Sequence, residues 1–139
     1  MSVQAVLLPV FVQVALTFAL LLWLAHLRTS QLARKEVKAR DIALGQKAWP
    51  EITLKVGNAF ENQLELPLLF YALVGFALIA HKTDLLFVIM SWVFVLCRVV
   101  HAYIHTGSND VRVRGPVYGI GLVVLLAMWA IFAVRVMMS

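Results

Sequence analysis

Four long apolar runs are the feature that most limits how this chain can fold. A helix needs roughly 20 apolar residues to cross the hydrocarbon core of a bilayer. The composition agrees with four such helices, because 63% of the 139 residues are hydrophobic and only 14% are charged, which is more apolar surface than a soluble domain of this size can bury. The sequence predicts an all-α membrane protein, one four-transmembrane-helix bundle over 1–139, with helices near 5–26, 58–80, 85–104 and 116–136.

The first apolar run and the single cysteine exclude two other classes. No basic residue precedes the run and no small-residue cleavage site follows it, so we expect it to be retained as a helix and not removed as a secretory signal. Cys97 lies inside the third run. One cysteine cannot form a disulfide framework or a paired-thiol redox site.

The basic residues concentrate between the first two predicted helices. They are Arg28, Arg34, Lys35, Lys38, Arg40, Lys47 and Lys55. Loops rich in Lys and Arg stay in the cytoplasm, so loops 27–57 and 105–115 are predicted to be cytoplasmic and both termini to lie on the opposite side. A basic loop beside anionic lipid accounts for the net charge of +5, and no nucleic-acid partner is expected. The expected host is a bacterial inner membrane, with the endoplasmic reticulum as the alternative.

Local residue preferences predict where several helices begin and end. Gly57 with Asn58 is predicted to open the second helix, Asn58 acting as its cap. Gly107 is predicted to end the third helix. Gly115 with Pro116 is predicted to open the fourth, because proline is tolerated at helix starts.

Polar side chains lie three or four positions apart near one end of each helix. They are Asn58, Glu61, Asn62 and Glu65 in the second helix, Arg98, His101 and His105 in the third, Arg114 and Tyr118 in the fourth, and His26 and Arg28 at the end of the first. Residues with this spacing share one helix face. We therefore expect them to meet at one depth, just inside the cytoplasmic leaflet.

Charges at that depth need partners or a ligand. A charged side chain in the hydrocarbon costs roughly 2.5 to 3.5 kcal/mol on insertion scales, and Glu65 and Arg98 are natural partners, either as a structural ion pair or as part of a ligand site. Pro67 should kink the second helix near Glu65, because it lacks the N–H that the helix needs. Arg98, Arg114 and Arg28 exceed the acids inside the bundle, which favours an anion-binding pocket.

These residues resemble those of a known membrane family. The resemblance lies in Asn62 with Glu65 followed by proline and aromatic residues, in RVVH at 98–101, and in RGPVY at 114–118. These elements are similar to motifs of the membrane-associated proteins in eicosanoid and glutathione metabolism, the MAPEG family, which includes microsomal glutathione transferases and prostaglandin E synthase. The number of helices and the long first cytoplasmic loop are similar as well.

The resemblance implies a homotrimer that binds glutathione between neighbouring subunits at the cytoplasmic side. It implies a transferase or peroxidase whose lipophilic electrophile enters from the membrane lipid. Arg114 would stabilise the glutathione thiolate, which is the nucleophile, and Tyr118 would add a hydroxyl or a stacking contact. The residues assigned to glutathione binding are Arg28, Asn58, Asn62, Glu65, Arg98, His101 and His105.

Two positions depart from the family pattern and keep other functions open. Members usually carry arginines where this chain has Asn58 and Glu61. The absence of these two arginines favours a non-catalytic member that binds a lipid or a partner protein. A small multidrug or proton-coupled transporter is a third hypothesis, but such carriers need an acid in mid-membrane and the first helix has none.

No metal is expected, because His101 and His105 have ligand spacing without a third ligand nearby.

Overall fold

A computed structural model describes residues 1–45 and 48–139, so Lys47, one of the basic loop residues, lies outside the described part of the chain. Its helices are α1 (Val3–Ala33), α2 (Ala39–Ile42), α3 (Glu51–Asn62), α4 (Leu66–Ile79), α5 (Leu85–Thr106) and α6 (Val111–Met137). Helices α3 and α4 follow one another as a single interrupted span. The resulting four spans of 31, 29, 22 and 27 residues are long and apolar enough to cross a membrane, which confirms the predicted four-helix membrane bundle.

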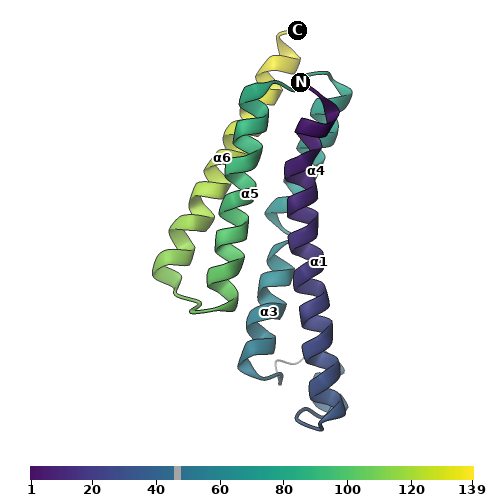
Figure 1. The fold of residues 1–139 in the computed structure, drawn as a ribbon. Helices are drawn as coiled ribbons and strands as arrows, with labels where there is room; N and C mark the ends of the chain where they lie inside the picture. The colour runs from purple at the N-terminus through teal and green to yellow at the C-terminus, as the bar shows by residue number, and fades with distance from the viewer. Residues whose placement is uncertain (46–47) are drawn as a thin grey trace.

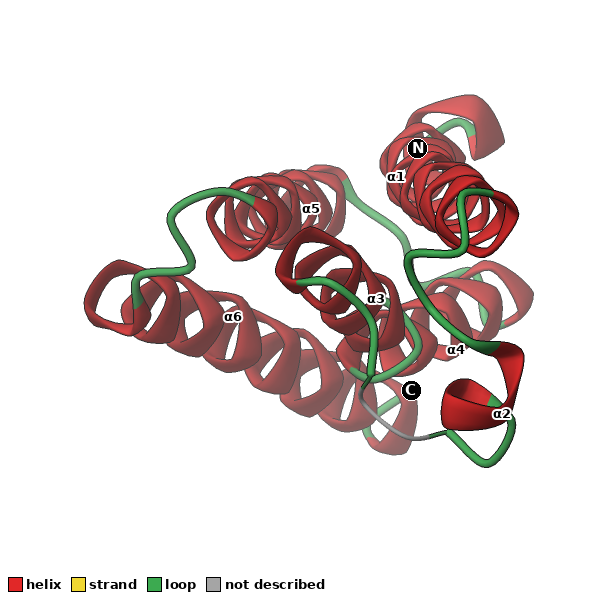
Figure 2. Ribbon diagram, turned by 90° about the horizontal axis from the view of Figure 1, so that it is seen from below, coloured by secondary structure: helices red, strands yellow, loops and turns green. Residues whose placement is uncertain are grey.

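The long helices lie side by side along one direction (Figure 1). Helix α5 packs along α6 as a hairpin, and α1 packs against α3, α4 and α5. Both chain termini lie at one end of the bundle with the turn at 80–84, and we call this the terminus end. The opposite end, which we call the loop end, carries residues 34–45 and 107–110; the short α2 lies there, to one side of the long helices (Figure 2).

The helices extend beyond the apolar stretches that predicted them. Helix α1 continues to Ala33 and α3 begins at Glu51, so the segment between them is shorter than the predicted loop 27–57. Hydropathy marks only the part of a helix that lies in hydrocarbon, whereas the hydrogen-bonded backbone can continue into the polar interface until it is capped.

The start of α3 shows why the predicted start at Gly57 and Asn58 is wrong. The first turn of α3 lies earlier and is supported by an i,i+4 ion pair of 3.4 Å between Glu51 and Lys55. Gly57 is inside the helix, where a Cβ atom would lie 3.6 Å from Nη2 of Arg28. The glycine therefore faces α1 at ordinary packing distance and does not mark a boundary.

The turn between α5 and α6 follows one prediction and corrects another. Gly107 is the C-cap of α5, as predicted. Helix α6 begins earlier than predicted because Asp110 caps it, its Oδ1 accepting a hydrogen bond of 3.0 Å from the backbone N–H of Arg112. Pro116 lies inside α6, so the prediction that Gly115 and Pro116 open this helix is wrong.

The second span is interrupted between Asn62 and Leu66. The backbone N–H groups of Leu64 and Glu65 bond to carbonyls only three residues back, at 3.0 and 3.3 Å, which tightens the end of α3. Glu65 has the non-helical angles φ −99° and ψ −101°, and Pro67 follows in the first turn of α4. The predicted kink near Glu65 is confirmed, and it is a full break in the helix.

Apolar packing concentrates toward the terminus end. The large buried cluster comprises Val6, Leu66, Phe70, Leu73, Val74, Ala77, Phe87, Val88, Phe94, Val95, Leu125 and Met128. The rings of Phe70 and Phe94 anchor it, with centroids 4.9 Å apart. A smaller cluster of Leu20, Ala59 and Ala102 lies toward the loop end.

Candidate functional site

Arg98 lies buried between helices in the loop-end half of the bundle. Its side chain is on α5 and the residue is 1% exposed. Its Nη2 donates to the side-chain Oδ1 of Asn62 at 2.6 Å and to the backbone carbonyl of Asn62 at 3.2 Å. Asn62 is the last residue of α3, so this contact joins α3 to α5. Because the amide is neutral, the positive charge of Arg98 is hydrogen-bonded without being neutralised.

A row of three rings begins at this arginine. The guanidinium carbon of Arg98 lies 5.7 Å from the ring centroid of Tyr118 on α6, within the range of a cation–π contact. The ring of His101 lies 5.5 Å from that of Tyr118 and 5.4 Å from that of His105. We call Asn62, Arg98, His101, His105 and Tyr118 the Arg98 cluster.

Four buried nitrogen atoms of the Arg98 cluster have no hydrogen-bond partner among residues 1–45 and 48–139. They are Nε and Nη1 of Arg98 and Nδ1 of both His101 and His105. Nearly all buried polar groups in proteins are hydrogen-bonded, and an unpaired one costs about 1 to 3 kcal/mol. Guanidinium nitrogens only donate, whereas a neutral imidazole nitrogen donates or accepts. The arrangement suits a ligand that carries negative charge and acceptor oxygens.

Arg114 borders the Arg98 cluster on the loop-end side. Its Nη1 donates to the side chain of Asn109 in the turn between α5 and α6. Asn109 has a positive φ of 54°, a conformation that asparagine tolerates better than most residues. Arg114 lies one turn before Tyr118 on α6, and the ring of Tyr118 contacts that of His101. A second cation therefore stands near the cluster.

A polar cavity of about 370 Å³ opens at the loop end beside α1 and α3, and we call it the loop cavity. Its lining residues are Arg28, Ile42, Gly45, Trp49, Thr53, Leu54, Gly57, Asn58 and Glu61. The guanidinium of Arg28 lies 5.3 Å from the centroid of the Trp49 ring. Of the residues assigned to one site from sequence, Arg28 and Asn58 thus lie in the loop cavity and not in the Arg98 cluster.

Glu65 lies apart from both groups of residues. The ion pairs of the described chain do not include one between Glu65 and Arg98, so the predicted pairing is wrong. The reason is the break in the second span: the helix face shared by Asn58 and Asn62 ends before Glu65, whose side chain is exposed.

The sequence also matches a known family over nearly its whole length. The model of the MAPEG family matches residues 6–134. The chain belongs to the MAPEG family. No curated protein and no solved structure matches it. With four membrane-spanning helices, it is an integral membrane protein of a family with glutathione-related transferase, peroxidase or related functions.

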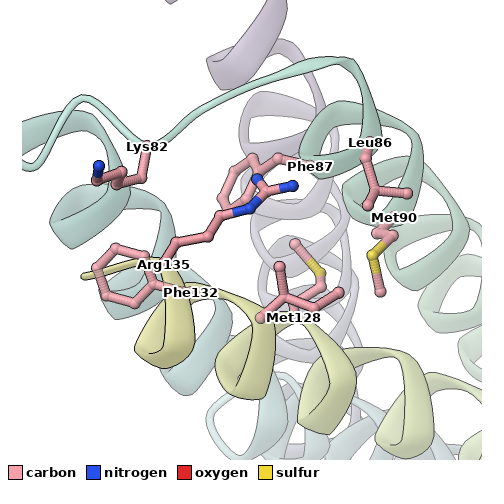
Figure 3. Close-up of a pocket in the computed structure, with 8 residues that line it drawn as sticks. Lys82, Leu86, Phe87, Met90, Met128, Phe132 and Arg135 are labelled. Atoms are coloured by element: carbon pink, nitrogen blue, oxygen red, sulfur yellow. The ribbon is translucent and has the colours of Figure 1, made fainter. Parts of the chain in front are cut away.

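This MAPEG protein has a second, more apolar hollow at its terminus end (Figure 3). Its lining residues are Lys82, Leu86, Phe87, Met90, Met128, Ile131, Phe132 and Arg135. Figure 3 shows the Arg135 side chain extending from α6 toward Phe87. Nη1 of Arg135 forms an ion pair of 2.9 Å with Oδ2 of Asp84. Arg135 is thus paired with a carboxylate, unlike Arg98.

Sequence reasoning missed a buried hydrogen bond between two spans of this MAPEG bundle. Gln13 in α1 is 0% exposed, and its Nε2 donates to Oε1 of Gln63 at 2.8 Å. An amide inside an apolar run is a signal that could have been used, because polar side chains within membrane spans usually bond to another helix. The contact between Asn109 and Arg114 could not be predicted in this way, because it depends on the shape of the turn between α5 and α6.

Proposed function

We propose that this protein is a glutathione-dependent transferase or peroxidase that acts on lipophilic electrophiles. The observation that carries the proposal is Arg98, a buried guanidinium two of whose nitrogens lack a partner in the described chain. In a medium of low dielectric constant such a group binds an anion through strong, charge-assisted hydrogen bonds. Glutathione carries two carboxylates and a thiol, and the MAPEG family generally uses it as a substrate.

The two polar regions divide the binding of the tripeptide between them. Arg28 and Asn58 in the loop cavity hold the end of glutathione nearer the loops, whereas Arg98, His101 and His105 hold the deeper end. Asn58 and Asn62 lie one turn apart on α3, which connects the loop cavity with the Arg98 cluster. The tripeptide therefore extends along α3.

Exposure of Glu65 supports the proposal that the subunits form a homotrimer. Its side chain lies on the outside of a single chain at the break of the second span. An exposed carboxylate at membrane depth is costly unless another chain covers it. In the trimer, Glu65 contacts the glutathione bound against a neighbouring subunit.

Arg114 and Tyr118 carry the chemical step. A free thiol has a pKa of roughly 8.5, and a nearby guanidinium favours its ionised form. Arg114 therefore stabilises the thiolate of glutathione. In conjugation the thiolate sulfur forms a bond to an electrophilic carbon as the leaving group departs with its electron pair. Tyr118, whose ring already contacts Arg98, adds a hydroxyl that hydrogen-bonds to the sulfur or to the leaving group.

The ultraviolet absorbance of the glutathione thiolate tests this proposal. Glutathione is titrated into the purified protein near neutral pH, beside Arg114→Ala and the matched control Arg112→Ala, which removes an exposed arginine from the same turn of α6. We expect a thiolate band in the native protein and in Arg112→Ala, and its loss in Arg114→Ala. A band of equal size in Arg114→Ala would refute the role of Arg114, and no band in the folded native protein would refute thiolate activation.

A second candidate function is non-catalytic binding of a lipid or a partner protein. It is favoured by the loop cavity, where Asn58 and the exposed carboxylate of Glu61 replace the arginines that family members usually carry. A hydrophobic ligand that binds equally well with and without glutathione would support this function over catalysis.

A further inference from the structure

Gln13 bonds to the point where the second span is interrupted. Its Nε2 donates to Oε1 of Gln63 at 2.8 Å, and Nε2 of Gln63 donates to the carbonyl of Ala59 at 2.9 Å. Gln13 is 0% exposed and Gln63 is 1% exposed. Gln63 is the C-cap of α3. A side chain of α1 thus contacts the first residue after α3 ends.

At this depth the lipid offers no hydrogen-bonding groups that could replace the bond between Gln13 and Gln63. Hydrocarbon offers no hydrogen bonds, so a buried amide must find its partner in another part of the protein. Gln63 uses its oxygen for Gln13 and its nitrogen for Ala59, so both ends of its side chain are fixed. The backbone leaves the helical conformation two residues later, at Glu65, so fixing the Gln63 side chain fixes the end of α3 from which the break departs.

The contact lies one residue from the Arg98 cluster. Asn62 precedes Gln63 and offers both its side-chain and its backbone oxygen to Arg98. The backbone carbonyl of Asn62 also accepts the N–H of Glu65 across the break. A shift of the break therefore moves both acceptors of Arg98 at once.

Proline alone does not explain the geometry of the break. Pro67 removes one helical hydrogen bond, which permits a kink without setting its direction. The tightened turn at Leu64 and Glu65 lies before the proline, next to Gln63. A second determinant is needed there, and the bond from α1 provides it.

We propose that Gln13 is a positioning residue that acts through Gln63. It holds the break between α3 and α4 in a position where both oxygens of Asn62 accept hydrogen bonds from Arg98. Its effect on glutathione binding rests on the proposed function, whereas its effect on the break does not.

Amide hydrogen exchange at the break tests the inference directly. The variant Gln13→Met keeps a side chain of similar length without the donor, and Gln4→Met changes an exposed glutamine of the same helix as the control. Loss of one buried hydrogen bond corresponds to about a five-fold change in an opening equilibrium. We expect exchange at Leu64, Glu65 and Leu68 to be about five-fold faster in Gln13→Met and unchanged in Gln4→Met. Equal exchange rates in the two variants would overturn the inference.

A double variant separates positioning from general stabilisation of the bundle. Gln13→Met leaves the oxygen of Gln63 unpaired, whereas Gln13→Met/Gln63→Met removes both partners of that bond and, with them, the bond from Gln63 to Ala59. We expect the melting temperature to recover in part in the double variant while exchange at the break stays fast and glutathione affinity stays about five-fold weaker than native. Recovery of the exchange rates together with the melting temperature would show that the pair only stabilises the bundle.

The two proposals fail in different ways. If the native protein does not bind glutathione, the proposed function fails, and the exchange rates at the break still decide the role of Gln13. If glutathione binds, and Gln13→Met changes neither the exchange rates at the break nor the glutathione affinity, the proposed function stands and the positioning role is refuted.

Discussion

Arg98 and Arg135 are both arginines on membrane-spanning helices, but the protein holds them in different ways. Arg135, at the terminus end, is paired with the carboxylate of Asp84 at 2.9 Å, and both side chains are partly exposed. Arg98 is buried in the loop-end half and bonds to the neutral amide of Asn62. The charge of Arg135 is balanced by a carboxylate, whereas the charge of Arg98 has only a neutral partner in the described chain.

The difference favours the Arg98 cluster over the terminus end as the proposed ligand site. An ion pair at a membrane interface needs nothing further to be stable, whereas a buried cation with a neutral partner carries a cost that a bound anion can offset. Proteins retain such costs mainly where function requires them. The comparison therefore predicts that the two arginines respond oppositely to removal.

The largest effect is expected from Arg98→Met. We propose that Arg98 contacts glutathione, and removing a buried charge that contacts a ligand costs several kcal/mol of binding free energy, so we expect glutathione affinity to fall about 100-fold. The free energy of unfolding should stay the same or rise, because an apolar side chain replaces a desolvated charge. Isothermal titration and thermal unfolding in detergent measure the two effects. A large loss of stability together with the loss of binding would show instead that Arg98 is structural.

A smaller effect is expected from Asn62→Leu. This change removes the side-chain acceptor of Arg98 and leaves only the backbone carbonyl at position 62, 3.2 Å away. The free energy of unfolding should fall by about 2 kcal/mol, and glutathione affinity should fall about tenfold because the guanidinium is less firmly oriented. Chemical unfolding and ligand titration measure both quantities. Combining Asn62→Leu with Arg98→Met should restore stability, and failure to restore it would mean that Asn62 does not act through Arg98.

The smallest effect is expected from Arg135→Met. Partly exposed ion pairs contribute about 1 kcal/mol or less, and Asp84 keeps its second contact, a 2.9 Å hydrogen bond from the backbone N–H of Phe87. We expect a slight decrease in melting temperature and unchanged glutathione affinity. A change in affinity comparable to that of Arg98→Met would remove the distinction between the two ends.

The fold was more predictable than the contacts of the site. Four spans, the kink near Glu65 and the end of α5 at Gly107 follow from hydropathy, proline chemistry and glycine preference, which act locally along the chain. The starts of α3 and α6 were predicted too late, because caps and polar turns outside the hydrocarbon, such as that made by Asp110, leave no mark in hydropathy.

The partner of Arg98 was predicted incorrectly for a physical reason. Helical spacing placed Glu65 on the same face as Asn62 only if the second span was continuous. The break ends that face at Asn62, so the amide contacts Arg98 and the carboxylate does not. A single residue with non-helical backbone angles thus decided which side chain holds the buried cation.

The sequence by itself determined that this chain crosses a membrane four times and that arginines, histidines and amides fall within its spans, because hydrocarbon length and polarity are properties of the chain read residue by residue. Only the tertiary structure decided that Asn62 holds Arg98, that Arg28 lies instead with Trp49, and that Gln13 contacts the break. These choices depend on how helices approach and rotate against one another, and within lipid that is set by close packing and interhelical hydrogen bonds.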